Sequence, residues 1–145
     1  MNILILCTGN SCRSQMAEGF LKSFNNKLEV FSAGTYPAKK VHPKAVQVMN
    51  EIGIDIRYNQ PKDVEEFIHQ NFHYVITVCN NAKENCPVFR GNVHKRLHIE
   101  FDDPAEARGT NAEILSEFRR VRDEINNDFT NFYTHQITID NEEKQ

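Results

Sequence analysis

The N-terminal segment constrains the fold more than any other part of the sequence. Residues 2–6 (NILIL) form a short run that is apolar after its first residue, which is typical of a central parallel strand covered on both faces. Directly after Arg13, the residues Met16, Phe20 and Phe24 recur at helical spacing. The chain is therefore expected to pass from a buried strand, through the loop CTGNSCR, into a helix.

The rest of the chain alternates short apolar runs with helical patterns. Further strands are predicted at 28–34, 73–78 and 96–101, and helices at 42–53 and 63–70. This alternation predicts right-handed crossovers and an α/β fold with a doubly wound, four-stranded parallel sheet flanked by helices. In such sheets ligands bind outside the C-terminal ends of the strands, so chemistry is expected there.

The C-terminal part of the sequence predicts a long final helix. Thr110 and Glu113 fit a capping box, and apolar residues within 114–129 mark one face of the helix that follows. Residues 135–145 are predicted to form a polar C-terminal tail, which leaves a single domain over residues 1–134.

Composition and charge exclude several classes of protein. The 145 residues are 39% hydrophobic and 26% charged, which suits one ordinary globular domain. Net charge is −3 and the basic residues are scattered among acids, so nucleic acid is not expected as a partner. No run approaches the ~20 apolar residues of a membrane span, and no basic leader precedes the first apolar run. We therefore expect a cytoplasmic monomer with no membrane segment.

Four cysteines, Cys7, Cys12, Cys79 and Cys86, call for an explanation. A reducing cytosol keeps thiols free unless they are catalytic, metal-bound or redox-active. Zinc ligands usually come in pairs about two to four residues apart, whereas these positions differ by five and by seven, with no histidine next to either pair. The spacing therefore favours thiol chemistry, and no bound metal is expected.

The loop from Cys7 to Arg13 has the pattern of an oxyanion site. Backbone N–H groups in such a turn point inward, the helix N-terminus adds partial positive charge, and Arg13 directs two donors at a tetrahedral dianion. This field is expected to lower the pKa of Cys7 and make it a thiolate nucleophile. The alternative is a buried cysteine at a strand end beside a surface arginine. The expected oxyanion-binding residues are Thr8, Gly9, Asn10, Ser11, Cys12, Arg13 and Ser14.

Three residues in this region have predictable local roles. Gly9 can take a backbone conformation closed to other residues, and Asn10 tolerates the left-handed region better than most. Ser14 either donates its hydroxyl to the Cys7 thiolate or caps the helix. The loop is therefore expected to be tight and specific in shape.

The segment CTGNSCRSQMAEG resembles the phosphate-binding loop of the low-molecular-weight protein tyrosine phosphatase superfamily and, within it, of the thioredoxin-coupled arsenate reductases. The resemblance covers residues 2–130. In that family an Asp-Pro segment near the fourth strand supplies the general acid, and residues 101–104 (FDDP) match it, which implies Asp103 as the acid. Asp102 is the alternative, since Asp-Pro also occurs in ordinary turns. A proton donor is needed because an oxygen leaves a tetrahedral oxyanion poorly unless it is protonated.

A second segment separates the reductases from the phosphatases. A phosphatase needs one nucleophile and water, whereas reducing arsenate to arsenite takes two electrons that thiols must supply. Residues 79–87 (CNNAKENCP) resemble the redox segment of the reductases. The resemblance implies that Cys7 attacks arsenic, that Cys79 attacks Cys7 and expels arsenite, and that Cys86 then attacks Cys79. A thioredoxin-like dithiol would reduce the resulting Cys79–Cys86 disulfide, with no bound cofactor.

The relay requires Cys86 to move toward its partner. Residues 80–85 are predicted to form a polar loop that reorganises at modest cost. The alternative for Cys79 and Cys86 is a buried strand-end thiol and a loop thiol without redox function. Cys12 is expected to be a neighbour of the relay, although oxidation can pair it with Cys7.

Some reductases of this family bind a cation behind the loop. Asn10, Glu18 and Ser32 map onto that cation site, but Lys62 stands near the place where the family has an acid. We therefore expect the Lys62 ammonium to substitute for a bound potassium ion.

Two other functions remain open at this point. A low-molecular-weight tyrosine phosphatase, acting through a cysteinyl-phosphate intermediate, would use the same nucleophile, arginine and acid, with Tyr36 or Tyr58 beside the cleft. A redox-sensing domain would toggle a Cys79–Cys86 disulfide without turnover, but Asp103 has no role in such a switch. Because phosphate and arsenate esters have similar shape and charge, weak phosphatase activity is expected in a reductase as well.

Overall fold

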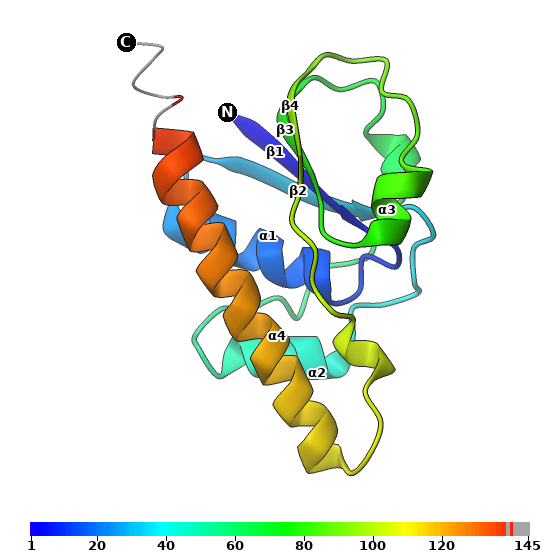
Figure 1. The fold of residues 1–145 in the computed structure, drawn as a ribbon, viewed down its shortest axis with the longest axis vertical. Helices are drawn as coiled ribbons and strands as arrows, with labels where there is room; N and C mark the ends of the chain where they lie inside the picture. Colours follow the sequence, from blue (N-terminus) through cyan, green and yellow to red (C-terminus); the bar gives the residue numbers. More distant parts are fainter. Residues whose placement is uncertain (139, 141–145) are drawn as a thin grey trace.

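A parallel sheet forms the centre of the protein (Figure 1). The structure is a computed structural model, and it describes residues 1–138 and 140. Within these residues four strands pair in the order β2-β1-β3-β4, and every pairing is parallel. The predicted doubly wound, four-stranded parallel sheet is therefore confirmed. The strands are β1 (Asn2–Cys7), β2 (Glu29–Gly34), β3 (Phe72–Thr77) and β4 (Val93–His98).

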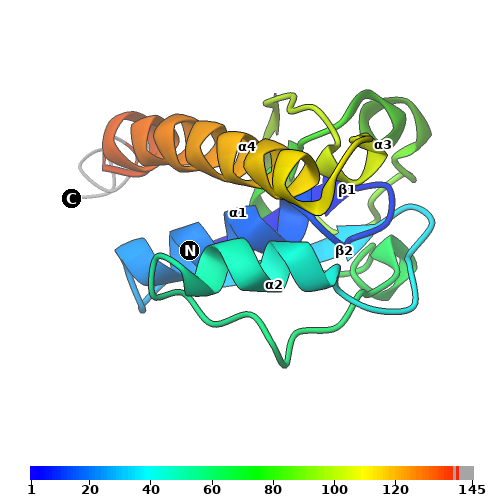
Figure 2. The same ribbon diagram turned by 90° about the horizontal axis from the view of Figure 1, so that it is seen from below.

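Helices lie on both sides of this sheet (Figures 1 and 2). Three of them, α1, α2 and α4, pack together on one side, and α3 lies on the other. No helix in the described part of the chain is both long and apolar enough to cross a membrane. The helical elements are α1 (Arg13–Phe24), α2 (Pro43–Asn50), η1 (Val64–Glu66), α3 (Asn80–Asn85), η2 (Pro104–Glu106), α4 (Asn111–Phe132) and η3 (Tyr133–Ile137).

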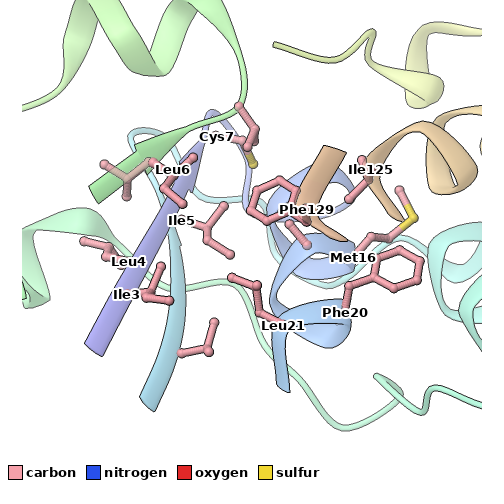
Figure 3. Packing of buried hydrophobic residues seen from close by; sticks show 14 of the residues in the cluster. Ile3, Leu4, Ile5, Leu6, Cys7, Met16, Phe20, Leu21, Ile125 and Phe129 are labelled. Atoms are coloured by element: carbon pink, nitrogen blue, oxygen red, sulfur yellow. The ribbon is translucent and has the colours of Figure 1, made fainter. Parts of the chain in front are cut away.

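Strand β1 is buried on both faces. Ile3 to Leu6 have no exposed surface, and Figure 3 shows Ile5 pointing toward Leu21 of α1 and Phe129 of α4, while Leu6 points away from them. Burial of each such side chain contributes about 1.5–3 kcal/mol. This packing fixes the strand, and therefore fixes the position of the residue that ends it.

The long helix α4 begins and packs as predicted. The Thr110 hydroxyl accepts a hydrogen bond from the Glu113 N–H (3.1 Å), and the Glu113 carboxylate accepts one from the Thr110 N–H (3.3 Å). Phe118, Ile125 and Phe129 of its apolar face are fully buried. The capping box and the apolar stripe are thus confirmed.

Several elements differ from the sequence-based prediction in their bounds: β2 by a single residue at its start, β3 by a single residue at each end, and α2 by spanning Pro43–Asn50 rather than 42–53. Two differ more. Strand β4 spans Val93–His98 rather than 96–101, because its alternating polar residues suit an edge strand and Val93 pairs with Phe72. The helix predicted at 63–70 contains only the turn η1, which a capping box at Asp63 begins.

The predicted polar loop at 80–85 is helical. Asn80 Nδ2 donates to Glu84 Oε1 (3.1 Å) and Asn85 Nδ2 donates to the Asn81 carbonyl (3.0 Å), so the polar residues bond along the helix itself. Ala82 is its buried residue. The polar composition suggested a loop, but local side-chain bonds favour α3.

The C-terminal segment packs more closely than the predicted tail. The helical backbone continues through η3, where Ile137 is 1% exposed. Asp140 is also buried, and its carboxylate accepts a hydrogen bond from Lys95 Nζ (2.9 Å). Residues 139 and 141–145 of the predicted tail lie outside the described residues, and the domain boundary at 134 stays a prediction.

Truncation of Phe129 tests the packing that holds β1. Phe129 is fully buried and its ring lies 6.2 Å from that of Phe101, between α4 and the loop after β4. We expect Phe129→Ala to lower the free energy of unfolding by about 3–5 kcal/mol, since it leaves a cavity. Urea denaturation measures this, with the exposed neighbour Asn127→Ala as control, expected within about 0.5 kcal/mol of the wild type. Equal effects of the two changes would contradict this packing.

Candidate active site

The loop between β1 and α1 lies at the C-terminal edge of the sheet. Cys7 ends β1 and Arg13 begins α1, and a cleft of about 550 Å³ opens over the loop between them. The cleft brings together Cys7, Arg13, Cys79 and Asp103, as the sequence predicts. Its full lining is Cys7, Thr8, Gly9, Ser11, Cys12, Arg13, Cys79, Asn80, Asn81, Glu100, Phe101, Asp103, Ala105 and Glu106.

The carbonyl groups of this loop are bonded from outside it. Those of Cys7, Thr8, Gly9 and Ser11 accept hydrogen bonds of 2.8–3.1 Å from backbone N–H groups within residues 35–42. These bonds hold the loop against the segment that follows β2. A loop held in this position, just before a helix N-terminus, is suited to bind an anion.

Asn10 holds the shape of the loop. Its backbone is left-handed (φ 51°), as expected, and its Nδ2 donates to Ser14 Oγ (2.8 Å) and Ser32 Oγ (2.9 Å). The expectation for Gly9 is wrong, because its φ is not positive and a Cβ there would meet only ordinary contacts. The residue that must be glycine is Gly34 of β2, where a Cβ would lie 2.4 Å from the Thr8 carbonyl.

The Cys7 sulfur is buried and oriented by hydrogen bonds. It lies 2.8 Å from Ser14 Oγ and accepts a bond from the Asn10 N–H (3.2 Å). Ser14 Oγ accepts from Asn10 Nδ2, and in its contact with Cys7 either the hydroxyl or the thiol can be the donor; with Cys7 ionised, the hydroxyl donates. Of the two roles predicted for Ser14, the structure therefore favours the contact with Cys7, and no side chain caps α1.

The pKa of Cys7 differs from the prediction. Burial raises the pKa of this thiol above its ordinary value, and this outweighs the lowering by the Ser14 hydrogen bonds, the Arg13 charge and the Asn10 N–H. The prediction of a lowered pKa is therefore wrong for this structure. The thiolate fraction of Cys7 grows as pH rises toward the raised pKa.

Arg13 and Asp103 face each other across the cleft. The guanidinium donates to the Phe101 carbonyl (3.2 Å) and lies 3.6 Å from the Asp103 carboxylate. Asp103 also accepts a bond from the Ala105 N–H (3.0 Å), which begins η2. The neighbouring Asp102 side chain is 78% exposed and forms an ion pair with Arg120 (3.1 Å). Only Asp103 of the two acids lines the cleft.

Cys12 and Cys79 line the same cleft in different surroundings. Burial, together with the Asp103 charge, raises the pKa of Cys12 to about 12, so this thiol stays protonated. Cys79 begins α3, where its sulfur accepts a weak bond from the Ala82 N–H (3.4 Å) and lies 3.4 Å from Thr8 Oγ1. Thr8 thus links Cys79 to the loop that carries Cys7.

Cys86 lies at the far end of α3, away from this cleft. It is half-buried and lines a separate hollow of about 220 Å³. A helical rise of about 1.5 Å per residue puts the Cα atoms of Cys79 and Cys86 about 10 Å apart, whereas a disulfide needs about 4.4–6.8 Å. The two thiols can therefore join only if α3 unwinds.

A buried polar network supports the loop from behind. The Glu18 carboxylate accepts from Ser32 Oγ (2.9 Å) and Lys22 Nζ (3.1 Å). Lys62 contributes its backbone N–H to Asn10 Oδ1 (2.9 Å), but its ammonium donates to the Gln60 carbonyl on the surface. The expectation that the Lys62 ammonium replaces a cation is therefore wrong, and Lys22 supplies the positive charge next to Glu18.

Two members of this network were missed by the sequence analysis. Gln15 is fully buried and its Nε2 donates to the backbone and side chain of Asn10 (3.2 and 3.1 Å). Asn59 Nδ2 donates to Gln15 Oε1 (3.1 Å) and Glu18 Oε2 (3.2 Å). For Gln15, the sequence signal that could have indicated this role is its place among the polar residues at the start of α1. Across residues 1–138 and 140, no group of three or more His, Cys, Asp or Glu side chains is placed to hold a metal ion.

Comparison with known proteins agrees with this geometry. Residues 2–144 match the family described as low molecular weight phosphotyrosine protein phosphatase. The arsenate reductase of Bacillus subtilis is 48% identical over 132 residues, which cover 90% of this chain and 93% of that protein. The arsenate reductase of Shouchella clausii is 48% identical over 124 residues, covering 85% and 88%. A solved arsenate reductase in the phosphate-binding state superimposes with a TM-score of 0.76 at 31% identity, covering 92% of this chain and 96% of that one. The chain therefore belongs to the low molecular weight phosphotyrosine protein phosphatase family.

Proposed function

We propose that this chain reduces arsenate to arsenite with a thiolate nucleophile and an intramolecular disulfide relay. The observation that carries the proposal is one cleft lined by Cys7, Arg13, Cys79 and Asp103. A phosphatase needs no second thiol beside its nucleophile, whereas a two-electron reduction does. The arsenate reductases at 48% identity support arsenate as the substrate.

The oxyanion binds in the loop that follows β1. Its N–H groups and the N-terminus of α1 present partial positive charge to the anion, and Arg13 adds a full charge. The Arg13 guanidinium is oriented by the Phe101 carbonyl, which limits its motion. The residues proposed to bind the anion are Thr8, Gly9, Asn10, Ser11, Cys12, Arg13 and Ser14.

In the first step Cys7 attacks arsenic while Asp103 protonates the oxygen that leaves. An S–As bond forms and an As–O bond breaks, with no change in oxidation state. Cys79 then attacks the Cys7 sulfur, so that the S–As electron pair passes to arsenic and arsenite leaves. The Cys7–Cys79 disulfide holds the oxidising equivalents at this stage.

In the next exchange Cys86 attacks Cys79 and Cys7 leaves as a thiolate. Helix α3 must unwind for this step, because it separates the two cysteines. The six-residue helix buries only Ala82, so the cost of unwinding is modest. A thioredoxin-like dithiol in the cytoplasm then reduces the Cys79–Cys86 disulfide of the monomer. Val88, two residues after Cys86, is 85% exposed, so this part of the chain lies at the surface.

A tyrosine phosphatase acting through a cysteinyl-phosphate intermediate is the second candidate. The family match and the shared Cys7, Arg13 and Asp103 favour it. However, Tyr36 and Tyr58 are 81% and 82% exposed and stand outside the lining of the cleft. A redox-sensing domain needs no acid beside its thiols, so that alternative does not explain why Asp103 lines the cleft. We therefore expect phosphatase activity only as a weak side reaction.

Removal of either relay thiol separates the two candidate reactions. Cys79→Ser and Cys86→Ser are each expected to abolish arsenate-dependent NADPH oxidation in an assay coupled through thioredoxin and its reductase. Hydrolysis of para-nitrophenyl phosphate needs neither thiol and is expected to persist, which also shows that the variants are folded. Arsenate turnover retained in both variants would contradict the relay.

Asp103 is the proposed general acid, so its loss should affect both reactions. We expect Asp103→Asn to lower arsenate reduction and phosphate ester hydrolysis by ~10²- to 10⁴-fold, because the leaving oxygen is no longer protonated. Asp102→Asn is the matched control, since Asp102 pairs with Arg120 outside the cleft, and its rates are expected to stay near the wild type. A larger loss in Asp102→Asn would transfer the role to that residue.

The Ser14 hydroxyl lowers the pKa of Cys7 against the effect of burial, which makes the pH profile a test of the geometry. Ser14→Ala removes a donor to the thiolate, so the pKa rises further and the thiolate fraction near neutral pH falls. We expect alkylation of Cys7 by iodoacetamide to slow about 3- to 10-fold and its pH profile to move upward. Ser23→Ala, at the other end of α1, serves as control. An unmoved profile in Ser14→Ala would rule out this hydrogen bond.

A further inference from the structure

The surroundings of Cys86 are not explained by the relay alone. The hollow that Cys86 lines lies on the α3 side of the sheet, and its walls include Val75 of β3. Three basic side chains line the same hollow, Lys83 from α3 and Arg96 and His98 from β4. A thiol that must act as a nucleophile thus lies in a hollow whose charged groups are basic.

Arg96 differs from the other two basic residues of the hollow in its surroundings. Within the described residues, neither Arg96 nor Lys83 has a carboxylate at ion-pair distance, whereas His98 lies 3.2 Å from Glu100. The Arg96 guanidinium lies over the Phe89 ring, 5.5 Å from its centre. The aromatic face orients the guanidinium without neutralising it. Lys83 is exposed on a flexible stem and has no such support.

The electrostatics of Cys86 agree with this arrangement. Burial raises the pKa of the Cys86 thiol, and the nearby Arg96 guanidinium opposes that rise. Attack on a disulfide requires the thiolate, so a group that brings the raised pKa of Cys86 back toward ambient pH speeds the exchange. An arginine stays charged throughout and therefore acts by its field rather than as a base.

We propose that Arg96 is a positioning residue for the second thiol exchange, holding the Cys86 sulfur in the hollow and stabilising its thiolate before α3 unwinds. The inference rests on the proposed function. Cys86 gives its proton to solvent, and its thiolate attacks the Cys79 sulfur of the Cys7–Cys79 disulfide. The Cys79–Cys86 bond forms, the Cys7–Cys79 bond breaks, and Cys7 leaves as a thiolate, so no further oxidant or reductant is needed.

The reactivity of Cys86 tests this role without any substrate. Alkylation by iodoacetamide is followed across pH by mass spectrometry of the peptide that contains Cys86. In Arg96→Gln we expect alkylation near neutral pH to slow about 3- to 10-fold and the profile to move to higher pH. Arg96→Lys keeps the positive charge and is expected to recover most of the rate. Arg90→Gln is the matched control, because Arg90 is exposed and lies outside the hollow.

Two results of the alkylation experiment would overturn the proposal. One is an unchanged profile in Arg96→Gln, and the other is an equal displacement in Arg90→Gln. Either result would mean that the Arg96 charge does not set the reactivity of Cys86.

A reaction with arsenate, quenched with acid, tests the role in the exchange itself. We expect Arg96→Gln to accumulate the Cys7–Cys79 disulfide, whereas the wild type passes on to Cys79–Cys86. Hydrolysis of para-nitrophenyl phosphate does not use Cys86 and is expected to be unchanged. No accumulation in Arg96→Gln, with turnover intact in the wild type, would overturn the role. If the wild type reduces no arsenate, the proposed function fails, and the alkylation profile still decides whether Arg96 controls Cys86.

Discussion

The rest of the structure depends on one constraint: the carbonyl groups of the loop after β1 accept hydrogen bonds from a segment outside the loop. A buried strand delivers Cys7 to the sheet edge, and residues 35–42 bind the loop carbonyls from outside. Because Gly34 has no side chain, β2 approaches the loop closely enough for this bonding. The polar network of Gln15 and Glu18 supports the loop from behind. In the proposed anion site the backbone of the loop thus sets the shape, and Arg13 adds the full positive charge.

The fold and the positions of Cys7 and Arg13 were predictable because their signals are local and strong. An apolar run before a Cys-x5-Arg loop and a helical pattern suffices to place Cys7 and Arg13. The bounds of the edge strand β4 were predicted too far along the chain, because the strand alternates polar residues with less exposed ones and lacks a continuous apolar run. The raised pKa of Cys7 was missed, since motif reasoning counts the nearby charges but not the burial that opposes them. The direction taken by the Lys62 ammonium depends on tertiary geometry, which no local pattern encodes.

Helix α3 reconciles stability with the movement that the proposed relay needs. It is short, and isolated helices below ~12–15 residues are marginal in water. Cys79 and Cys86 flank this helix and must meet in the proposed relay, so the helix that separates them is also the element that must unwind. The contact of Thr8 with Cys79 keeps the first of these thiols near Cys7 while α3 is folded. Reduction of the anion and rearrangement of the segment can therefore follow one another in order.

The most direct test of the account is a single turnover without external reductant, in which arsenite and the disulfides are measured together. The account predicts a single equivalent of arsenite per protein molecule, accompanied by a disulfide between Cys79 and Cys86 and a free Cys7. Formation of no arsenite would contradict it. So would arsenite accompanied by a disulfide between Cys7 and Cys12, because the electrons would then have come from a thiol outside the proposed relay.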